Sequence, residues 1–161
     1  VDGPIAIRYP RGSAHQGLRE YQAPVEYGRS EIIRKGKKIA VLGVGSMIPS
    51  CMEICKGLKD DGYDPTFVNA RFVKPLDVDL LDELAKDHSL FVTVEENVKN
   101  GGYGEHVSAY MEACHPEIRV LSAAVWDRFV PQGNVESLRS RIGLGVEDIR
   151  QAIEDSEELR E

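Results

Sequence analysis

Short apolar runs recur along the chain and predict the strands of a sheet. Five runs have this character: residues 32–33, 39–43, 66–69, 90–94 and 118–121. Residues 39–43 are continuously apolar, which is typical of a strand buried on both faces of a sheet, and residues 90–94 are likewise predicted to be a buried strand. The lysine-rich turn around Gly36 predicts that the first two strands pair as an antiparallel hairpin.

Between these runs, apolar residues recur every three or four positions, which predicts amphipathic helices. One stripe contains Cys51, Cys55 and Leu58, and we expect Ser46 to be its N-cap. Further helices are predicted from Asp77 or Asp79, after Gly104, from Asn134 and around Ile149. Strands alternating with helices predict an α/β fold: a three-layer α/β/α sandwich with about five mostly parallel strands and one antiparallel edge strand.

The N-terminus has a strand pattern without a partner. Ile5 and Ile7 alternate with other residues, and Pro10 stops the pattern because it has no N–H to donate. We therefore expect this strand to belong to a neighbouring domain. The predicted division is residues 1–12 as the last strand of an upstream domain, 13–24 as a linker and 25–161 as an α/β domain.

Composition narrows the class of protein. With 161 residues, 42% hydrophobic and 29% charged, the chain can form a globular domain with a real core. Its net charge of −7 argues against nucleic acid as a partner. No apolar run approaches the ~20 residues that span a bilayer, so no membrane partner is expected. Three cysteines argue against a disulfide framework and fit a reducing cytoplasm.

Candidate chemistry is sought at the carboxyl ends of the strands, where open α/β sheets bind ligands. Gly43 and Gly45 resemble the start of a dinucleotide fingerprint, but Ile48 replaces its third glycine and Asn69 its acidic residue. A tight strand-to-helix turn is therefore the favoured interpretation. Cys51 and Cys55 could form a metal pair, but we favour their role as small core residues.

Two more strand ends carry polar or aromatic residues. Glu95 and Glu96 are adjacent on a strand, so they point opposite ways and cannot act as a pair on one substrate atom. We expect hydrogen bonds from a carboxylate to the backbone N–H groups of the next helix, which the glycines at 101–104 allow to come close. Residues 127–133 form either a contact surface or a rigid connection. Without a nucleophile paired to a histidine, no self-contained active site is visible.

Taken together, several segments resemble a known family. They are Gly3-Pro-x-Ala-x-Arg-Tyr-Pro-Arg-Gly12, Leu42-Gly-x-Gly-Ser46, Asn69-Ala-Arg-Phe-Val-Lys-Pro-Leu-Asp77, Val92-Thr-Val-Glu-Glu-Asn97 and Asp127-x-Phe-Val-Pro-Gln-Gly133. This series resembles the C-terminal part of the transketolase-like, thiamine-diphosphate-dependent enzymes. The opening Arg-Tyr-Pro-Arg-Gly favours the 1-deoxy-D-xylulose-5-phosphate synthases among them.

The resemblance implies an enzyme that condenses pyruvate with glyceraldehyde 3-phosphate, with loss of CO₂, at the entry to the non-mevalonate isoprenoid route. Thiamine diphosphate, Mg²⁺ and the catalytic glutamate would lie in two upstream domains, so this chain would hold no cofactor and be inactive alone. The full-length enzyme would be a cytoplasmic homodimer. One residue carries over: Arg11 would bind the phosphate of glyceraldehyde 3-phosphate, a role that suits the planar donors of a guanidinium.

One segment departs from the family pattern. Where the family usually has Gly-x-Pro-Asp, this chain has Ala124-Val125-Trp126-Asp127, so no role is carried over to that loop. Trp126 is instead a candidate for packing against a missing domain or partner chain. Two alternatives stay open: a 2-oxoacid dehydrogenase β-subunit domain, and a stand-alone nucleotide-binding or interaction module.

Overall fold

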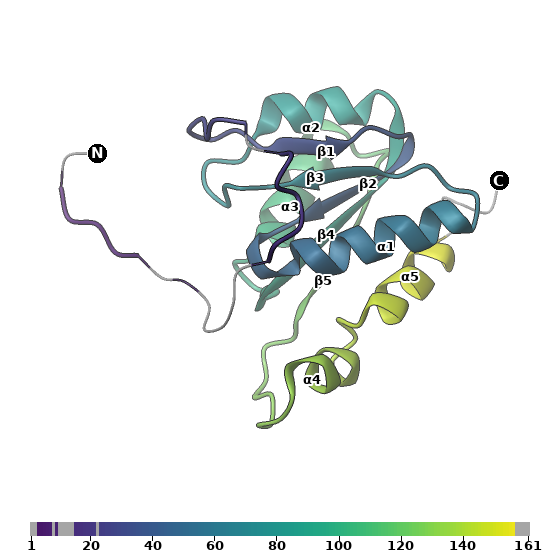
Figure 1. The fold of residues 1–161 in the computed structure, drawn as a ribbon. Helices are drawn as coiled ribbons and strands as arrows, with labels where there is room; N and C mark the ends of the chain where they lie inside the picture. The colour runs from purple at the N-terminus through teal and green to yellow at the C-terminus, as the bar shows by residue number, and fades with distance from the viewer. Residues whose placement is uncertain (1–2, 8, 10–14, 22, 157–161) are drawn as a thin grey trace.

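The computed structural model describes residues 3–7, 9, 15–21 and 23–156. Its strands are β1 (Glu31–Arg34), β2 (Lys38–Gly43), β3 (Thr66–Asn69), β4 (His88–Val98) and β5 (Arg119–Val125). Its helices are the 3₁₀ turn η1 (Gly45–Met47), α1 (Ile48–Asp60), α2 (Val78–Ala85), α3 (Tyr103–Cys114), α4 (Val135–Arg141) and α5 (Val146–Glu154). Strands and helices alternate along the chain as the sequence predicts (Figure 1).

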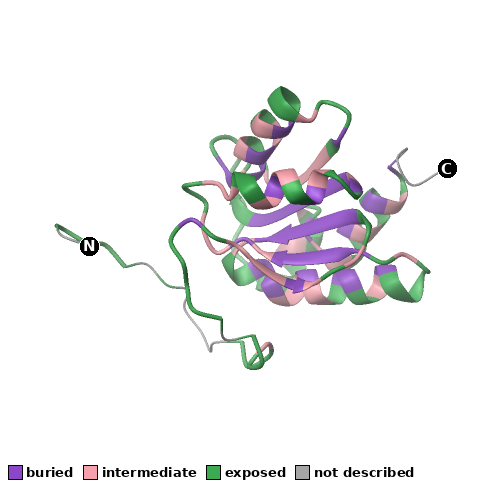
Figure 2. Cartoon of the chain, turned by 90° about the horizontal axis from the view of Figure 1, so that it is seen from above, coloured by how far each residue is buried: buried purple, intermediate pink, exposed green. Residues whose placement is uncertain are grey.

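The five strands form one mixed sheet in the order β1-β3-β2-β4-β5. β2, β3, β4 and β5 are parallel, and β1 runs antiparallel to β3 at one edge. One apolar cluster joins α1 and α5 to one face of the sheet, and a second joins α2 and α3 to the other face. The buried strands therefore lie between two helical layers (Figure 2), and the predicted α/β/α sandwich is confirmed.

The predicted β1–β2 hairpin is wrong, because β3 lies between the two strands. The short connection after β1 crosses the start of β3 instead of folding back on itself. There Gly36 donates its N–H to Thr66 Oγ1 at 2.9 Å, and Lys37 donates to the Asp64 carbonyl at 2.6 Å. A Cβ on Gly36 would come within 2.0 Å of that carbonyl oxygen, so the crossing requires glycine.

The predicted helix caps are partly confirmed. Asp77 caps α2 by accepting a hydrogen bond from the Leu80 N–H, and Asn134 caps α4 through the N–H groups of Glu136 and Ser137. Ser46 does not cap α1: it lies within η1, and its hydroxyl donates to Glu96. An extra 3₁₀ turn after β2 therefore moves the N-cap of α1 from Ser46 to Met47, and the helix begins at Ile48.

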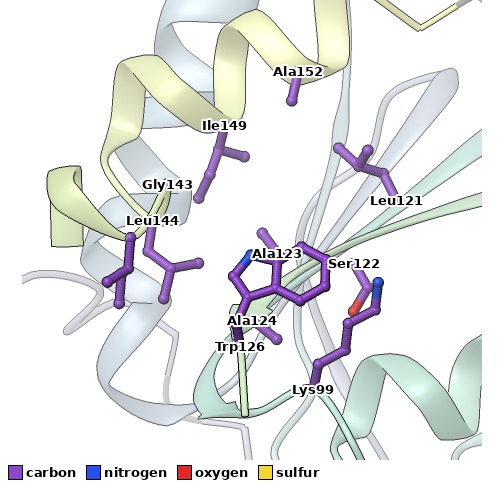
Figure 3. Close-up of a pocket in the computed structure, with 11 residues that line it drawn as sticks. Lys99, Leu121, Ser122, Ala123, Ala124, Trp126, Gly143, Leu144, Ile149 and Ala152 are labelled. Carbon is purple, nitrogen blue, oxygen red and sulfur yellow. The ribbon is translucent and has the colours of Figure 1, made fainter. Parts of the chain in front are cut away.

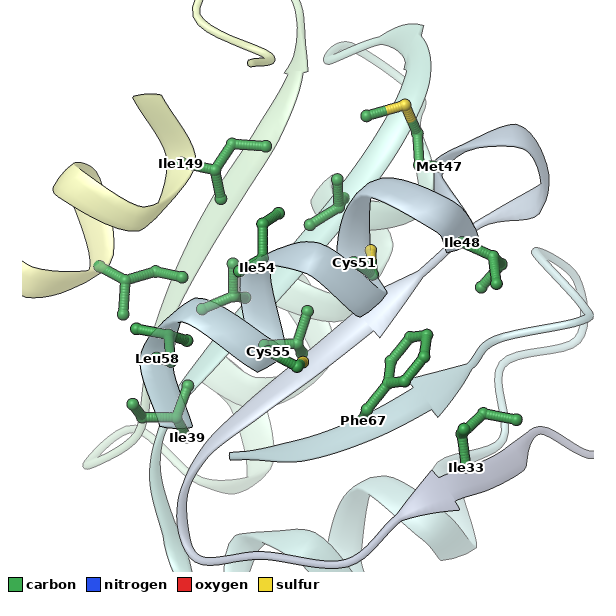
Figure 4. Packing of buried hydrophobic residues seen from close by; sticks show 14 of the residues in the cluster. Ile33, Ile39, Met47, Ile48, Cys51, Ile54, Cys55, Leu58, Phe67 and Ile149 are labelled. Carbon is green, nitrogen blue, oxygen red and sulfur yellow. The ribbon is translucent and has the colours of Figure 1, made fainter. Parts of the chain in front are cut away.

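Cys51 and Cys55 are confirmed as core residues on the inner face of α1 (Figure 4). Both thiols are buried with Ile54, Leu58 and Phe67. Burial is the main cause that raises the pKa of Cys51, and it raises the pKa of Cys55 to about 12, so both thiols stay protonated near neutral pH. Among the described residues, no three His, Cys, Asp or Glu side chains form a group that could hold a metal ion.

A candidate functional face at the carboxyl edge of the sheet

Glu95 is a buried carboxylate at the end of β4 that holds the start of α3. It is only 2% exposed, and its two oxygens accept hydrogen bonds from the backbone N–H groups of Tyr103 and Gly104 at 2.9 and 2.8 Å. These donors belong to the first turn of α3, where N–H groups lack partners within the helix. The predicted use of a carboxylate at this position is confirmed, and it is structural.

Glycines allow this close approach of α3 to the sheet. A Cβ on Gly102 would lie 2.6 Å from Glu95 Oε1, and one on Gly104 would lie 2.1 Å from Ser122 Oγ. The first turn of α3 can therefore reach both β4 and β5 only with glycine at these positions.

Glu96 points away from Glu95, as strand alternation predicts, and joins three elements. It accepts from Ser46 Oγ at 2.8 Å and from the Arg139 guanidinium at 3.1 Å. Burial by itself would raise the pKa of Glu96, but the hydrogen bonds from Arg139 and Ser46 outweigh it, so this pKa is lowered. Glu96 thus fastens η1 and α4 to the end of β4.

The glycines at the end of β2 and just after it are required by the local geometry. A Cβ on Gly43 would lie 2.8 Å from Cys51 Sγ, and Gly45 has a positive φ of 53°. The favoured interpretation, a tight strand-to-helix turn, is confirmed by this geometry.

The segment that enters the domain is fastened to the end of β3. Arg71 forms an ion pair with Glu31 at 2.6 Å and donates to the carbonyls of Ala23 and Pro24. Arg29 pairs with the carboxylates of Asp77 and Asp79 at 2.9 and 2.6 Å. No role was predicted for Arg71 from the sequence. The signal that could have found it is a basic residue two positions after a buried strand.

The loop after β5 is exposed over its whole length, from residue 126 to residue 134. Phe129 makes no burying contact, with a relative exposure of 104%. Trp126 is 57% exposed, and the ammonium of Lys99 lies 4.9 Å from its ring centroid, a cation–π distance. Of the two predicted alternatives for this loop, this exposure favours a contact surface over a rigid connection.

Beside this loop lies an apolar cavity of about 170 Å³ between β5 and the α4–α5 region (Figure 3). Leu121, Ala123, Leu144 and Ile149 line it, and Trp126 closes one side. Its polar lining is Ser122, whose Oγ accepts a hydrogen bond from Thr93 Oγ1, and Lys99, whose ammonium lies over the Trp126 ring. The cavity therefore offers mainly shape and hydrophobic contact.

Arg11, the predicted phosphate-binding residue, lies outside the described residues. Residues 3–7 and 9 of the same segment form no strand within this chain, and Ile5, Ile7 and Tyr9 are exposed. Their assignment to an upstream sheet stays a prediction, as does the linker at 13–24. No helix in the described ranges is long and apolar enough to cross a membrane.

Three features define the class of this domain. They are a five-stranded sheet with an antiparallel edge at β1, the Glu95 cap on α3, and the Glu96–Arg139 contact between β4 and α4. Residues 28–149 match the family described as "Transketolase, C-terminal domain", and the chain belongs to that family.

Several sequence relatives are 1-deoxy-D-xylulose-5-phosphate synthases. The enzyme of Lachnoclostridium phytofermentans is 42% identical over 149 residues, covering 92% of this chain and 24% of that protein. Those of Chlorobaculum tepidum and Dictyoglomus thermophilum are 39% and 40% identical, covering 92% and 94% of this chain and 24% and 25% of those proteins. The chain thus spans about a quarter of the length of these relatives.

Solved structures agree on the fold. A split gene transketolase, solved as an inactive tetramer of four β subunits, aligns with a TM-score of 0.78 and 28% identity over 85% of this chain and 45% of that chain. The transketolase of Campylobacter jejuni aligns with a TM-score of 0.53 and 16% identity over 80% of this chain and 19% of that chain, which shows the fold alone.

Proposed function

We propose that this chain is the C-terminal domain of a 1-deoxy-D-xylulose-5-phosphate synthase. The observation that carries the proposal is the 42% identity over 149 residues to the Lachnoclostridium phytofermentans enzyme. The reaction joins pyruvate to glyceraldehyde 3-phosphate, releases CO₂ and yields 1-deoxy-D-xylulose 5-phosphate. The enzyme acts in the cytoplasm as a homodimer.

The described residues support a division of labour in which this domain holds no cofactor. Its buried carboxylate, Glu95, is used by the N–H groups of α3, and its buried thiols are protonated core residues. None of these groups fits Mg²⁺ or a diphosphate. By the family resemblance, thiamine diphosphate, which makes the pyruvate carbonyl carbon nucleophilic, and Mg²⁺ belong to the upstream domains.

Within this scheme Arg11 contacts the substrate. Its role is to bind the phosphate of glyceraldehyde 3-phosphate, which suits a guanidinium because its planar donors match phosphate oxygens. The rest of the domain forms the scaffold that follows it along the chain.

A chimera tests the proposal. This chain replaces the matching quarter of the Lachnoclostridium phytofermentans synthase, and product formation is measured with thiamine diphosphate, Mg²⁺ and both substrates. We expect turnover by the chimera and none by the isolated chain. A folded chimera without turnover would contradict the assignment, and turnover by the isolated chain would contradict the division of labour. A 2-oxoacid dehydrogenase β-subunit domain, the nearest alternative, would leave the chimera inactive.

A further inference from the structure

The topology places the entry of the chain at the carboxyl edge of the sheet. β1 is antiparallel to β3, and Glu31 at its start pairs with Asn69 at the end of β3. Any polypeptide that precedes β1 therefore reaches this domain at the edge where the parallel strands end (Figure 1). Arg71 and Arg29 fasten the entering segment there.

Exposed apolar side chains gather at the same edge. Among the described residues from 27 onward, every large hydrophobic side chain that is exposed lies in one of two places. One group is Tyr27 on the entering segment, Val73 between β3 and α2, and Val78 at the start of α2. The other group follows β5 and consists of Trp126, Phe129, Val130 and Val135. The outer faces of α1, α3 and α5 and the opposite, amino edge of the sheet contribute none. The two groups lie at opposite ends of the strand order, one beside β1 and β3 and the other beside β5, and exposed apolar groups of this kind are typical of interaction surfaces.

Two clamps keep this edge in shape without covering it. Arg139 and Ser46 hold α4 and η1 to Glu96 at the end of β4. Asn134 caps α4 directly after the exposed loop. The elements on either side of the aromatic loop are thus held in place, which lowers the entropic cost of binding through the loop.

We propose that this carboxyl edge is the docking face for the polypeptide that precedes the domain, with Phe129 and Trp126 as its anchors. The inference rests on the proposed function, which supplies that partner: the relatives are about four times as long as the matched segment, since it covers 24% of the Lachnoclostridium phytofermentans protein. Five strands set about 4.8 Å apart make an edge roughly 20 Å wide, a span that a neighbouring domain can cover. Exposed aromatic residues are the side chains that dominate such interfaces.

Hydrogen exchange of residues 126–135 tests the docking face. We compare the isolated chain with the chimera described above and expect these amides to exchange about tenfold more slowly, or slower still, in the chimera. Phe129→Ser should restore fast exchange in the chimera. It should leave the thermal midpoint of the isolated chain unchanged, because Phe129 is fully exposed there. Lys37→Ser, an exposed residue at the amino edge, is the matched control and should change neither quantity.

Several outcomes would overturn the inference, and they differ from failure of the proposed function. Equal exchange in an active chimera, or separate unfolding of its parts at their individual midpoints, would show that the edge is not docked. If light scattering shows that the isolated chain self-associates and Phe129→Ser dissociates it, the face is an interface between copies. A folded chimera that protects residues 126–135 but makes no product contradicts only the proposed reaction.

Discussion

The carboxylate of Glu95 is buried so that the first turn of α3 can bind to it. Glu95→Gln keeps the size of the side chain but removes the charge and one of its two acceptor oxygens. Hydrogen bonds to a charged group contribute about 1.5–3 kcal/mol each, so we expect the free energy of unfolding to fall by about 1–3 kcal/mol. Urea denaturation measures this loss.

Glu96→Gln is the variant to compare with Glu95→Gln. The Glu96 side chain also accepts hydrogen bonds, from Ser46 and Arg139, but it is more than one-third exposed. Solvent screens such contacts, and we expect a loss under about 1 kcal/mol. Equal losses for the two variants would show that burial does not distinguish the two carboxylates.

His88 is a second residue whose environment sets a measurable property. It lies buried at the amino edge of the sheet, where Nδ1 donates to the Leu84 carbonyl at 2.8 Å and Nε2 lies 2.7 Å from Thr66 Oγ1. Thr66 Oγ1 accepts the Gly36 N–H, so its own proton is available for Nε2. These contacts suit the neutral ring.

Acid should therefore destabilise the fold through His88. Burial is the largest effect and lowers the pKa of His88, although the Leu84 hydrogen bond and nearby Asp87 act in the opposite direction. The unfolded state, with a pKa of about 6.5, then binds a proton more readily than the folded state. The stabilisation is complete above that value and is lost as the pH falls through the lower folded pKa.

Urea unfolding at pH 7.5 and 5.5 measures this dependence. The free energy of unfolding should fall more between these values for the native chain than for His88→Gln, whose side chain does not titrate. Parallel losses in the two proteins would show that other groups cause the acid sensitivity.

At the scale of elements, the crossing from β1 to β2 depends on Gly36. An added Cβ meets backbone atoms of Asp64 and Pro65, which cannot rotate away as a side chain can. Gly36→Ala should cost about 1–3 kcal/mol, the usual range for overpacking, and it should loosen β1 from the sheet. Gly62→Ala, in an open turn with a φ of 94°, carries only the conformational cost and should be milder by denaturant midpoint. If Gly36→Ala destabilised the chain less than Gly62→Ala, the requirement for glycine at the crossing would be contradicted.

Local pattern was sufficient for most elements but not for the order of the strands. The runs around Val41 and Val92 are apolar because both faces of the sheet are covered, and that signal is contained in each run itself. The place of β3 between β1 and β2 is set by pairing between residues more than 30 positions apart, such as Ile32 and Val68. From the local sequence alone, the short turn at Gly36 resembles a hairpin. Tertiary pairing here overrode a local turn signal.

In the candidate site, too, some contacts could be predicted from local sequence and others depend on tertiary structure. The cap formed by Glu95 could be predicted, because a strand-end carboxylate and a glycine-rich helix start are close in sequence. The clamp between Glu96 and Arg139 joins residues 43 positions apart, and no local pattern indicates it. Arg71 lay within a motif of the family resemblance, but its bonds to the entering segment depend on how that segment folds back.

At the scale of the whole molecule, the remaining question is how this domain serves the reaction. Arg11 lies outside the described residues, so its role is tested by kinetics in the chimera. Arg11→Met should raise the KM for glyceraldehyde 3-phosphate about tenfold or more, because a charge-assisted, bidentate contact contributes about 1.5–3 kcal/mol. The KM for pyruvate, which has no phosphate, should stay within about twofold, since the interaction removed is with phosphate alone.

Arg11→Lys separates charge from geometry in the same assay. Lysine keeps the positive charge but loses the planar pair of donors, so its KM for glyceraldehyde 3-phosphate should lie between those of the native chimera and Arg11→Met. If both variants raise the two KM values equally, Arg11 supports the fold of the neighbouring domain rather than the phosphate. If neither value changes, the substrate contact lies entirely upstream, and this domain acts only through its docking face.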